Sequence, residues 1–123
     1  MNKFLVLSGL ALFFFLGCKT DSAEQLYPSP IACDTSNIKY SANVQPILQA
    51  NCMSQGCHIN GNANGGFQFD TYDNFKMTIT SGKLLNAIRY TAGGSKNMPP
   101  VGKMNDCDIK KIEAWVARGY PNN

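Results

Sequence analysis

The sequence predicts an all-α domain of three to five short helices joined by long loops. Apolar residues recur at helical spacing in four segments, and no segment alternates convincingly between apolar and polar residues as a strand does. The stretches between these segments are rich in glycine, asparagine and proline, which favour loops. A length of 123 residues leaves room for one domain at most.

The distribution of charge argues against a nucleic-acid-binding protein. The chain has 11 basic and 8 acidic residues, a formal net charge of +3, and no basic run longer than the pair Lys110 and Lys111. Proteins that bind nucleic acid concentrate lysine and arginine on one face. Hydrophobic residues make up 44% of the chain, which also argues against a disordered tail.

The first 17 residues have the pattern of a signal peptide. Lys3 is followed by 14 uncharged and mainly apolar residues, too few to span a bilayer comfortably, and the chain becomes polar directly after Cys18. This junction resembles the lipobox of bacterial lipoproteins, in which a small residue, here Gly17, precedes the lipidated cysteine. A buried N-terminal helix with an incidental cysteine is the alternative.

We therefore expect three parts: a lipoprotein signal peptide at residues 1–17, a lipidated Cys18 with a flexible tether at residues 18–32, and a folded domain at residues 33–123. Acyl chains on Cys18 would anchor the protein to a membrane. This organisation predicts a protein of the bacterial cell envelope whose domain lies outside the cytoplasm, in the periplasm or at the cell surface. The tether could instead pack on the domain as a coil.

The first helix is expected at residues 43–51, with Asn43 as its N-cap. Pro46 would then be the third helical residue, where the missing N–H breaks no internal hydrogen bond. The apolar face of this helix consists of Val44, Ile47 and Leu48.

Two further short helices are expected in the middle of the chain. Thr71 is placed to cap the first of them, and residues 83–90 form the second. Their apolar side chains are Tyr72, Phe75 and Met77 in the first and Leu84, Leu85 and Ile88 in the second. Loops at residues 60–66 and 91–103 flank these helices. Because such long loops bury little surface on a small domain, something further must hold the middle together.

The last helix has the clearest signals. Asn105 or Asp106 caps it, the carboxylates of Asp106 and Asp108 lie at its positive end, and Gly119 terminates it. Its apolar stripe consists of Ile109, Ile112 and Val116, with Trp115 beside it.

Two thiols and an imidazole lie within seven residues directly after the first predicted helix. Four residues separate Cys52 from Cys57, and His58, the only histidine, follows at once. This C-x4-C-H pattern is a variant of C-x-x-C-H, the attachment signature of c-type haem, so we expect one covalently bound haem c with His58 on its iron. A Cys52–Cys57 disulfide, a redox-active dithiol, or a zinc site completed by Cys33 or Cys107 are the alternatives. None of them explains the adjacent histidine.

Met98 is the expected second axial ligand of the haem iron. It lies 40 residues after His58 at the end of a glycine-rich loop, and Pro99 and Pro100 stiffen the chain that follows. A methionine thioether commonly accompanies histidine in electron-transfer cytochromes. Met104, directly before the last helix, is the alternative.

The order of these segments resembles the small monohaem c-type cytochrome domains of bacterial lipoproteins and the planctomycete-type cytochrome domains. The resemblance covers residues 33–120 and is carried by residues 40–48, the haem motif, Gly65-Gly66, Tyr72, residues 98–100, residues 106–109 and residues 112–116. It implies a cytochrome c-like fold, with the first and last helices packed beside one haem and Met98 as distal ligand. The four-residue spacer is longer than the usual two.

Cys33 and Cys107 are expected to form a disulfide by elimination. If Cys18 is lipidated and Cys52 and Cys57 hold haem, these two are the remaining thiols of the five, and an exported domain would oxidise them. Two unrelated thiols are the alternative.

The function expected from these features is electron transfer, with redox proteins as partners and without catalysis at the iron, since both axial positions are filled. Two other functions stay open at this point. One is a haem sensor or enzyme with an open sixth position. The other is a haem-free lipoprotein that binds a partner through a disulfide-braced surface.

Overall fold

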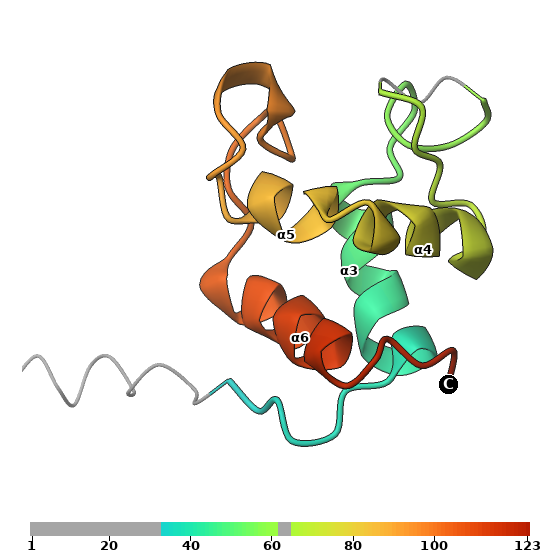
Figure 1. Ribbon diagram of the computed structural model, residues 1–123, viewed down its shortest axis with the longest axis vertical. Coiled ribbons are helices and arrows are strands. Elements are labelled where there is room, and N and C mark those ends of the chain that lie inside the picture. The colour runs from blue at the N-terminus through green and yellow to red at the C-terminus, as the bar shows by residue number, and fades with distance from the viewer. Residues whose placement is uncertain (1–32, 62–64) are drawn as a thin grey trace, which may run out of the picture. The chain divides into compact units, whose positions relative to one another are not determined.

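The computed structural model describes residues 33–61 and 65–123, which form helices and contain no strand (Figure 1). This part of the chain confirms the predicted all-α class. The expected signal peptide, Cys18 and the tether, residues 1–32, lie outside the described residues. None of the helices in the described ranges is long and apolar enough to cross a membrane.

Four α-helices, one π-helical turn and one 3-10 turn make up the described fold. The α-helices are α3 (Gln45–Asn51), α4 (Tyr72–Thr80), α5 (Lys83–Ile88) and α6 (Asp106–Ala117). A π-helical turn, η2 (Tyr40–Val44), leads directly into α3, and a 3-10 turn, η3 (Gly94–Lys96), lies in the loop between α5 and α6.

The first helical segment begins three residues earlier than predicted, at Tyr40. In an α-helix the ring of Pro46 would clash with the carbonyl of residue 42, and the wider η2 turn directly before it avoids this contact. Asn43 is therefore inside the turn and is not the N-cap. Its side-chain oxygen instead accepts a hydrogen bond of 2.9 Å from the backbone N–H of Lys39, the residue that does precede the helix.

The second predicted helix is confirmed as α4, and the third is shorter than predicted. The hydroxyl of Thr71 accepts the N–H of Asn74 and caps α4 as expected. Met77 was assigned to the apolar face of this helix but is half exposed, so that assignment is wrong. Helix α5 ends at Ile88 because Tyr90 adopts a left-handed conformation with φ of 65°, which cannot continue a helix.

The last helix is confirmed as α6, and its cap is resolved in favour of Asn105. The side chain of Asn105 accepts the N–H of Asp108 at 2.8 Å, and Gly119 follows the helix with φ of 83°. The predicted stripe needs one correction. Trp115 is fully buried, whereas Val116 is only half-buried, so the helix turns its indole ring and not the valine toward the core.

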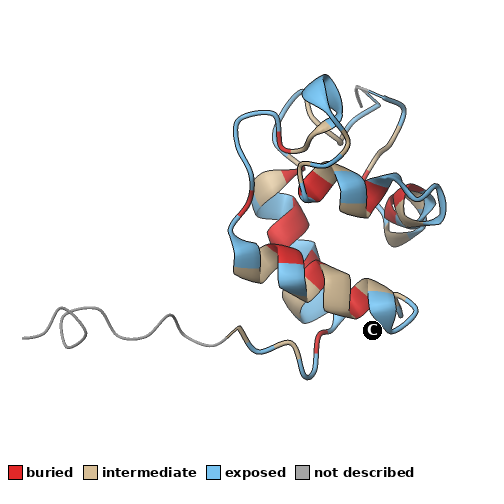
Figure 2. Cartoon of the chain, turned by 60° about the vertical axis from the view of Figure 1, so that its left-hand side comes forward, coloured by how far each residue is buried: buried red, intermediate tan, exposed pale blue. Residues whose placement is uncertain are grey.

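An aromatic cluster of Tyr40, Phe75 and Trp115 forms the centre of the core. The Trp115 ring stacks on Tyr40, with centroids 5.5 Å apart, and on Phe75, with centroids 5.9 Å apart. These rings come from η2, α4 and α6, so the cluster joins three separate segments. Buried residues lie along the side of α6 that faces this cluster, while the loop around η3 is mostly exposed (Figure 2).

The last residues of the chain close over this core. The side-chain oxygen of Asn123 accepts the N–H of Tyr40 and its backbone oxygen accepts the N–H of Ser41, both at 2.9 Å. The indole N–H of Trp115 donates to the carbonyl of Pro121 at 3.0 Å. The segment after α6 therefore supplies acceptors both for the start of the first helix and for the buried tryptophan.

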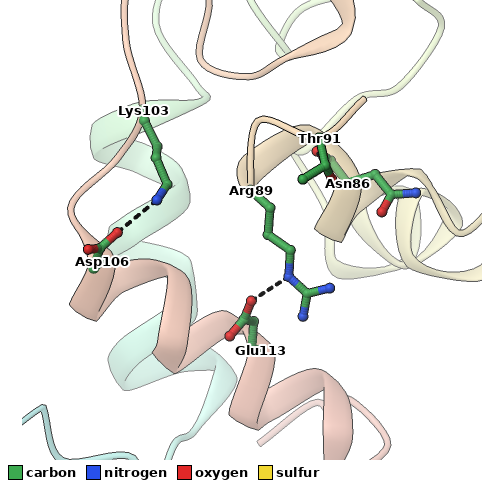
Figure 3. Close-up of polar contacts among 6 residues, drawn as sticks. All are labelled: Asn86, Arg89, Thr91, Lys103, Asp106 and Glu113. Carbon is green, nitrogen blue, oxygen red and sulfur yellow. Dashed lines mark hydrogen bonds and ion pairs between the residues drawn. The ribbon is translucent and has the colours of Figure 1, made fainter. Parts of the chain in front are cut away.

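Helices α5 and α6 are also joined by an ion pair. The Arg89 guanidinium lies 2.5 Å from a carboxylate oxygen of Glu113, and Figure 3 shows the contact bridging the two helices. A second pair, Lys103 with Asp106 at 2.9 Å, lies at the start of α6. Both pairs are partly exposed to solvent, so each contributes little to stability, and the apolar contacts determine how the helices pack.

Cys33 and Cys107 form a disulfide, as predicted, with an S–S distance of 2.06 Å. The bridge links the beginning of the described domain to the first turn of α6 across 74 residues of sequence. All four helices lie within this loop or begin at its end. The cross-link therefore restricts the unfolded chain over most of the domain.

We expect the paired substitution Cys33→Ser and Cys107→Ser to lower the free energy of unfolding by about 4 kcal/mol, the loop-closure value for a loop of this length. Denaturant unfolding of the variant and of the wild-type protein measures the difference. Equal stability of the two proteins, or two alkylatable thiols at these positions in the native oxidised protein, would contradict the assignment.

Candidate functional site

A cavity of about 160 Å³ brings together four residues that the sequence predicts to hold a cofactor: Cys52, Cys57, His58 and Met98. Most of its remaining wall is apolar and comes from all four helices and the loop before α6. The apolar residues include Leu48, Phe69, Leu84, Ile88, Pro99 and Ile112.

A second and larger cavity, of about 870 Å³, adjoins the first. Its wall shares His58, Thr78, Ala87, Met98 and Pro100 with the smaller cavity. The rest of its wall is more polar and includes Ser81, Lys83, Asn86, Ser95 and Lys96. His58 and Met98 thus line both spaces, whereas the two thiols line only the smaller one.

The segment that carries the thiols folds back on itself. The N–H of Cys57 donates to the carbonyl of Ser54 at 3.0 Å, and the N–H of His58 donates to the carbonyl of Cys52 at 3.1 Å. Gly56 makes the turn between them with φ of 82°, which a residue with a side chain rarely adopts. The four-residue spacer therefore closes into a compact loop and directs both thiols and the imidazole to one cavity.

His58 is held by two contacts that fix its ring. Its Nδ1 lies 2.7 Å from the carbonyl oxygen of Phe67, and its ring stacks on Phe69 with centroids 4.4 Å apart and an interplanar angle of 12°. A carbonyl oxygen can only accept, so Nδ1 carries the proton in this hydrogen bond. In the neutral ring the lone pair is then on Nε2, which is the arrangement of a histidine that ligates a metal.

Cys52 and Cys57 are unpaired thiols in the structure. Cys52 is buried, and burial, with a smaller contribution from Cys57, raises the pKa of its thiol to about 12. Cys52 therefore stays protonated at neutral pH, unlike the low-pKa thiolate that initiates dithiol exchange. In the structure the two thiols do not form the alternative Cys52–Cys57 disulfide.

The alternative zinc site lacks its fourth ligand. The sequence offered Cys33 or Cys107 for that position, but these two residues are bonded to each other. In residues 33–61 and 65–123, no group of three or more His, Cys, Asp or Glu side chains is arranged to hold a metal ion.

Met98 is positioned by its own backbone and by the loop around it. Its N–H donates to the carbonyl of Ala87 in α5 at 3.0 Å, and the Tyr90 hydroxyl donates to the carbonyl of Pro99. The rival, Met104, is 6% exposed, belongs to the hydrophobic core and lines neither cavity. The structure therefore brings Met98, and not Met104, to the same cavity as His58.

Thr78 is a site residue that the sequence analysis missed. It is 6% exposed, lines both cavities, and its hydroxyl oxygen has no hydrogen-bond partner. Its spacing in the sequence could have indicated this role. Thr78 follows the buried Phe75 by three residues in α4, which places both on the inner face of the helix. Phe67 could not be found in this way because its contribution to the site is a backbone carbonyl.

The residues around the two adjoining cavities supply the groups that a covalently bound haem requires. Two unpaired thiols suit attachment, a neutral imidazole and a thioether suit the two axial positions of iron, and the apolar wall suits the macrocycle. A buried hydroxyl without a partner indicates that a polar group is also accommodated there.

Comparisons with known proteins give no independent identification. The expectation of a covalently bound haem therefore depends on the motif and on the geometry described above. No protein-family model matches the chain, and no curated protein or solved structure is significantly similar to it.

Proposed function

We propose that the chain is a monohaem c-type cytochrome with a cytochrome c-like fold that transfers electrons at the bacterial cell envelope. The observation that carries this proposal is the shared cavity of Cys52, Cys57, His58 and Met98. Met98 is distant in sequence from the other three, and helices α4 and α5 lie between them. Thiols, imidazole and thioether are the set that haem c requires.

Each residue of this set has a role that its surroundings support. Cys52 and Cys57 would hold the haem through thioether bonds, and His58 Nε2 and Met98 Sδ would bind its iron. When bound, the haem supplies one-electron oxidation and reduction. The Phe67 carbonyl keeps the His58 proton on Nδ1, and the apolar wall of the smaller cavity borders both ligands on one side.

The same arrangement favours a carrier over an enzyme. His58 and Met98 would together supply both protein ligands of the iron, and His58 is the only histidine of the sequence, so no second imidazole is present for acid–base chemistry. A neutral thioether in apolar surroundings favours the reduced iron and hence a comparatively high potential. The partners on this proposal are redox proteins, met outside the cytoplasm by a domain that a lipid on Cys18 tethers to the membrane.

We expect the protein, produced together with a cytochrome c maturation system, to carry haem that survives a denaturing gel. Cys52→Ala and Cys57→Ala should each weaken or abolish the haem-stained band, because each removes one thioether bond. The matched control is the pair Cys33→Ser and Cys107→Ser, which removes two other cysteines and should keep the stain. Haem that extracts fully into acid acetone would contradict covalent attachment.

We expect Met98→Leu to erase the weak sulfur-to-iron absorption band in the far red and to shift the oxidised protein toward high spin. The midpoint potential should fall, because the lost thioether favours the reduced iron. Met104→Leu is the control, since it keeps the buried volume of a methionine that lines neither cavity. If Met104→Leu loses the band and Met98→Leu keeps it, Met104 is the ligand.

We expect Cys18→Ser to give unprocessed precursor or a protein without a lipid anchor, because the hydroxyl cannot form the thioether to the diacylglycerol. Detergent partitioning and the mass of the purified protein measure this change. A Cys18→Ser protein that still partitions into detergent and has the mature mass would show that the anchor lies elsewhere.

A further inference from the structure

We propose that Thr78, Lys83 and Lys96 form the binding site for the two propionate carboxylates of the haem, so that this edge of the group faces the larger cavity. The inference rests on the proposed function, since it takes covalent haem at Cys52 and Cys57 as given. It adds an orientation of the haem and a set of residues that the haem motif does not specify.

The position of the thiols gives the orientation. Cys52 and Cys57 line the smaller, apolar cavity and do not line the larger one. Haem is amphipathic, because its vinyl groups and its two propionates project from different edges of an apolar ring. Once the vinyl groups are bonded at the thiols, the propionates must point away from them. The larger cavity adjoins the smaller one at the wall that His58 and Met98 share, and neither thiol lines it, so we place the propionates there.

The charge of the larger cavity suits carboxylates. Lys83 and Lys96 both line it, and none of its lining residues is acidic. The Lys83 ammonium lies 5.2 Å from the ring centroid of Phe67, another residue of this wall, so the ring faces the charge. Within residues 33–61 and 65–123, the ion pairs involve Arg89 and Lys103, and neither Lys83 nor Lys96 forms one.

The hydroxyl of Thr78 supplies a donor at the boundary of the two cavities. Its helix neighbour Thr80 donates to carbonyls of α4, at 3.3 Å to Lys76 and 3.1 Å to Met77. Thr78 makes no such bond, although it is 6% exposed and lines both cavities. A buried hydroxyl is rarely left without a partner, and a carboxylate in the adjoining space would accept from it.

The test compares holoprotein variants by resonance Raman spectroscopy of the propionate bending modes and by redox titration. Thr78→Val keeps the shape of the side chain and removes the donor, and Lys83→Met removes one charge from the exposed part of the wall. The matched controls are Thr80→Val, whose hydroxyl bonds within its own helix, and Lys110→Met, whose side chain lines neither cavity.

We expect both site variants to shift the propionate modes and to lower the midpoint potential, because carboxylates with less compensation stabilise the oxidised iron. Both controls should match the wild-type protein. Unchanged modes and potentials in Thr78→Val and Lys83→Met, with haem still bound, would overturn the inference alone. A potential that added phosphate shifts while the propionate modes stay fixed would also overturn it, since the lysines would then hold a free anion. Absence of covalent haem from the wild-type protein would overturn the proposed function itself.

Discussion

The mutual packing of the Tyr40, Phe75 and Trp115 rings is the contact on which the rest of the domain depends. It joins η2, α4 and α6 on one side of the molecule. The same inner faces of α4 and α6 also border the smaller cavity, through Thr78 and Ile112, each three residues from a ring of the cluster. A change at the aromatic cluster would therefore alter the walls of the site as well as the core. The aromatic cluster and the smaller cavity therefore share two helices, α4 and α6.

Several apolar residues of this small domain line the smaller cavity. Leu48, Leu84 and Ile112 belong to the buried core, and each also lines the smaller cavity. Empty space beside a buried side chain forfeits dispersion energy, which a bound apolar group would restore. On the proposed function the macrocycle supplies those contacts and completes the core. The disulfide acts differently, because it restricts the unfolded chain and fills no space.

Features with strong local chemistry could be predicted from the sequence. The cap Thr71, the terminator Gly119 and the Cys33–Cys107 pairing each follow from a residue type with few alternatives, whereas the cap of α6 was narrowed only to Asn105 or Asp106. The π turn before α3 could not be predicted, since Pro46 indicates a constraint and not which of several turns relieves it. The Met77 and Trp115 assignments failed because short helices of similar apolar pattern rotate freely until tertiary contacts select a face. The sequence indicated that His58 and Met98 lie at one site only through the haem motif. The Phe67 carbonyl that orients His58 has no signature in the sequence, because it belongs to the backbone.

The polarity of the two cavities follows from the way α4 and α5 meet. The turn between them places Ser81 and Lys83 beside the larger cavity, while Leu84 and Ile88, one and five residues after Lys83, face the smaller one. One short helix thus offers an apolar side to one space and a cationic side to the other. A ligand that fits both must itself be apolar at one edge and anionic at another. Haem has this character, so the amphipathic pattern of α5 supports the cofactor proposed for the thiol motif without depending on that motif.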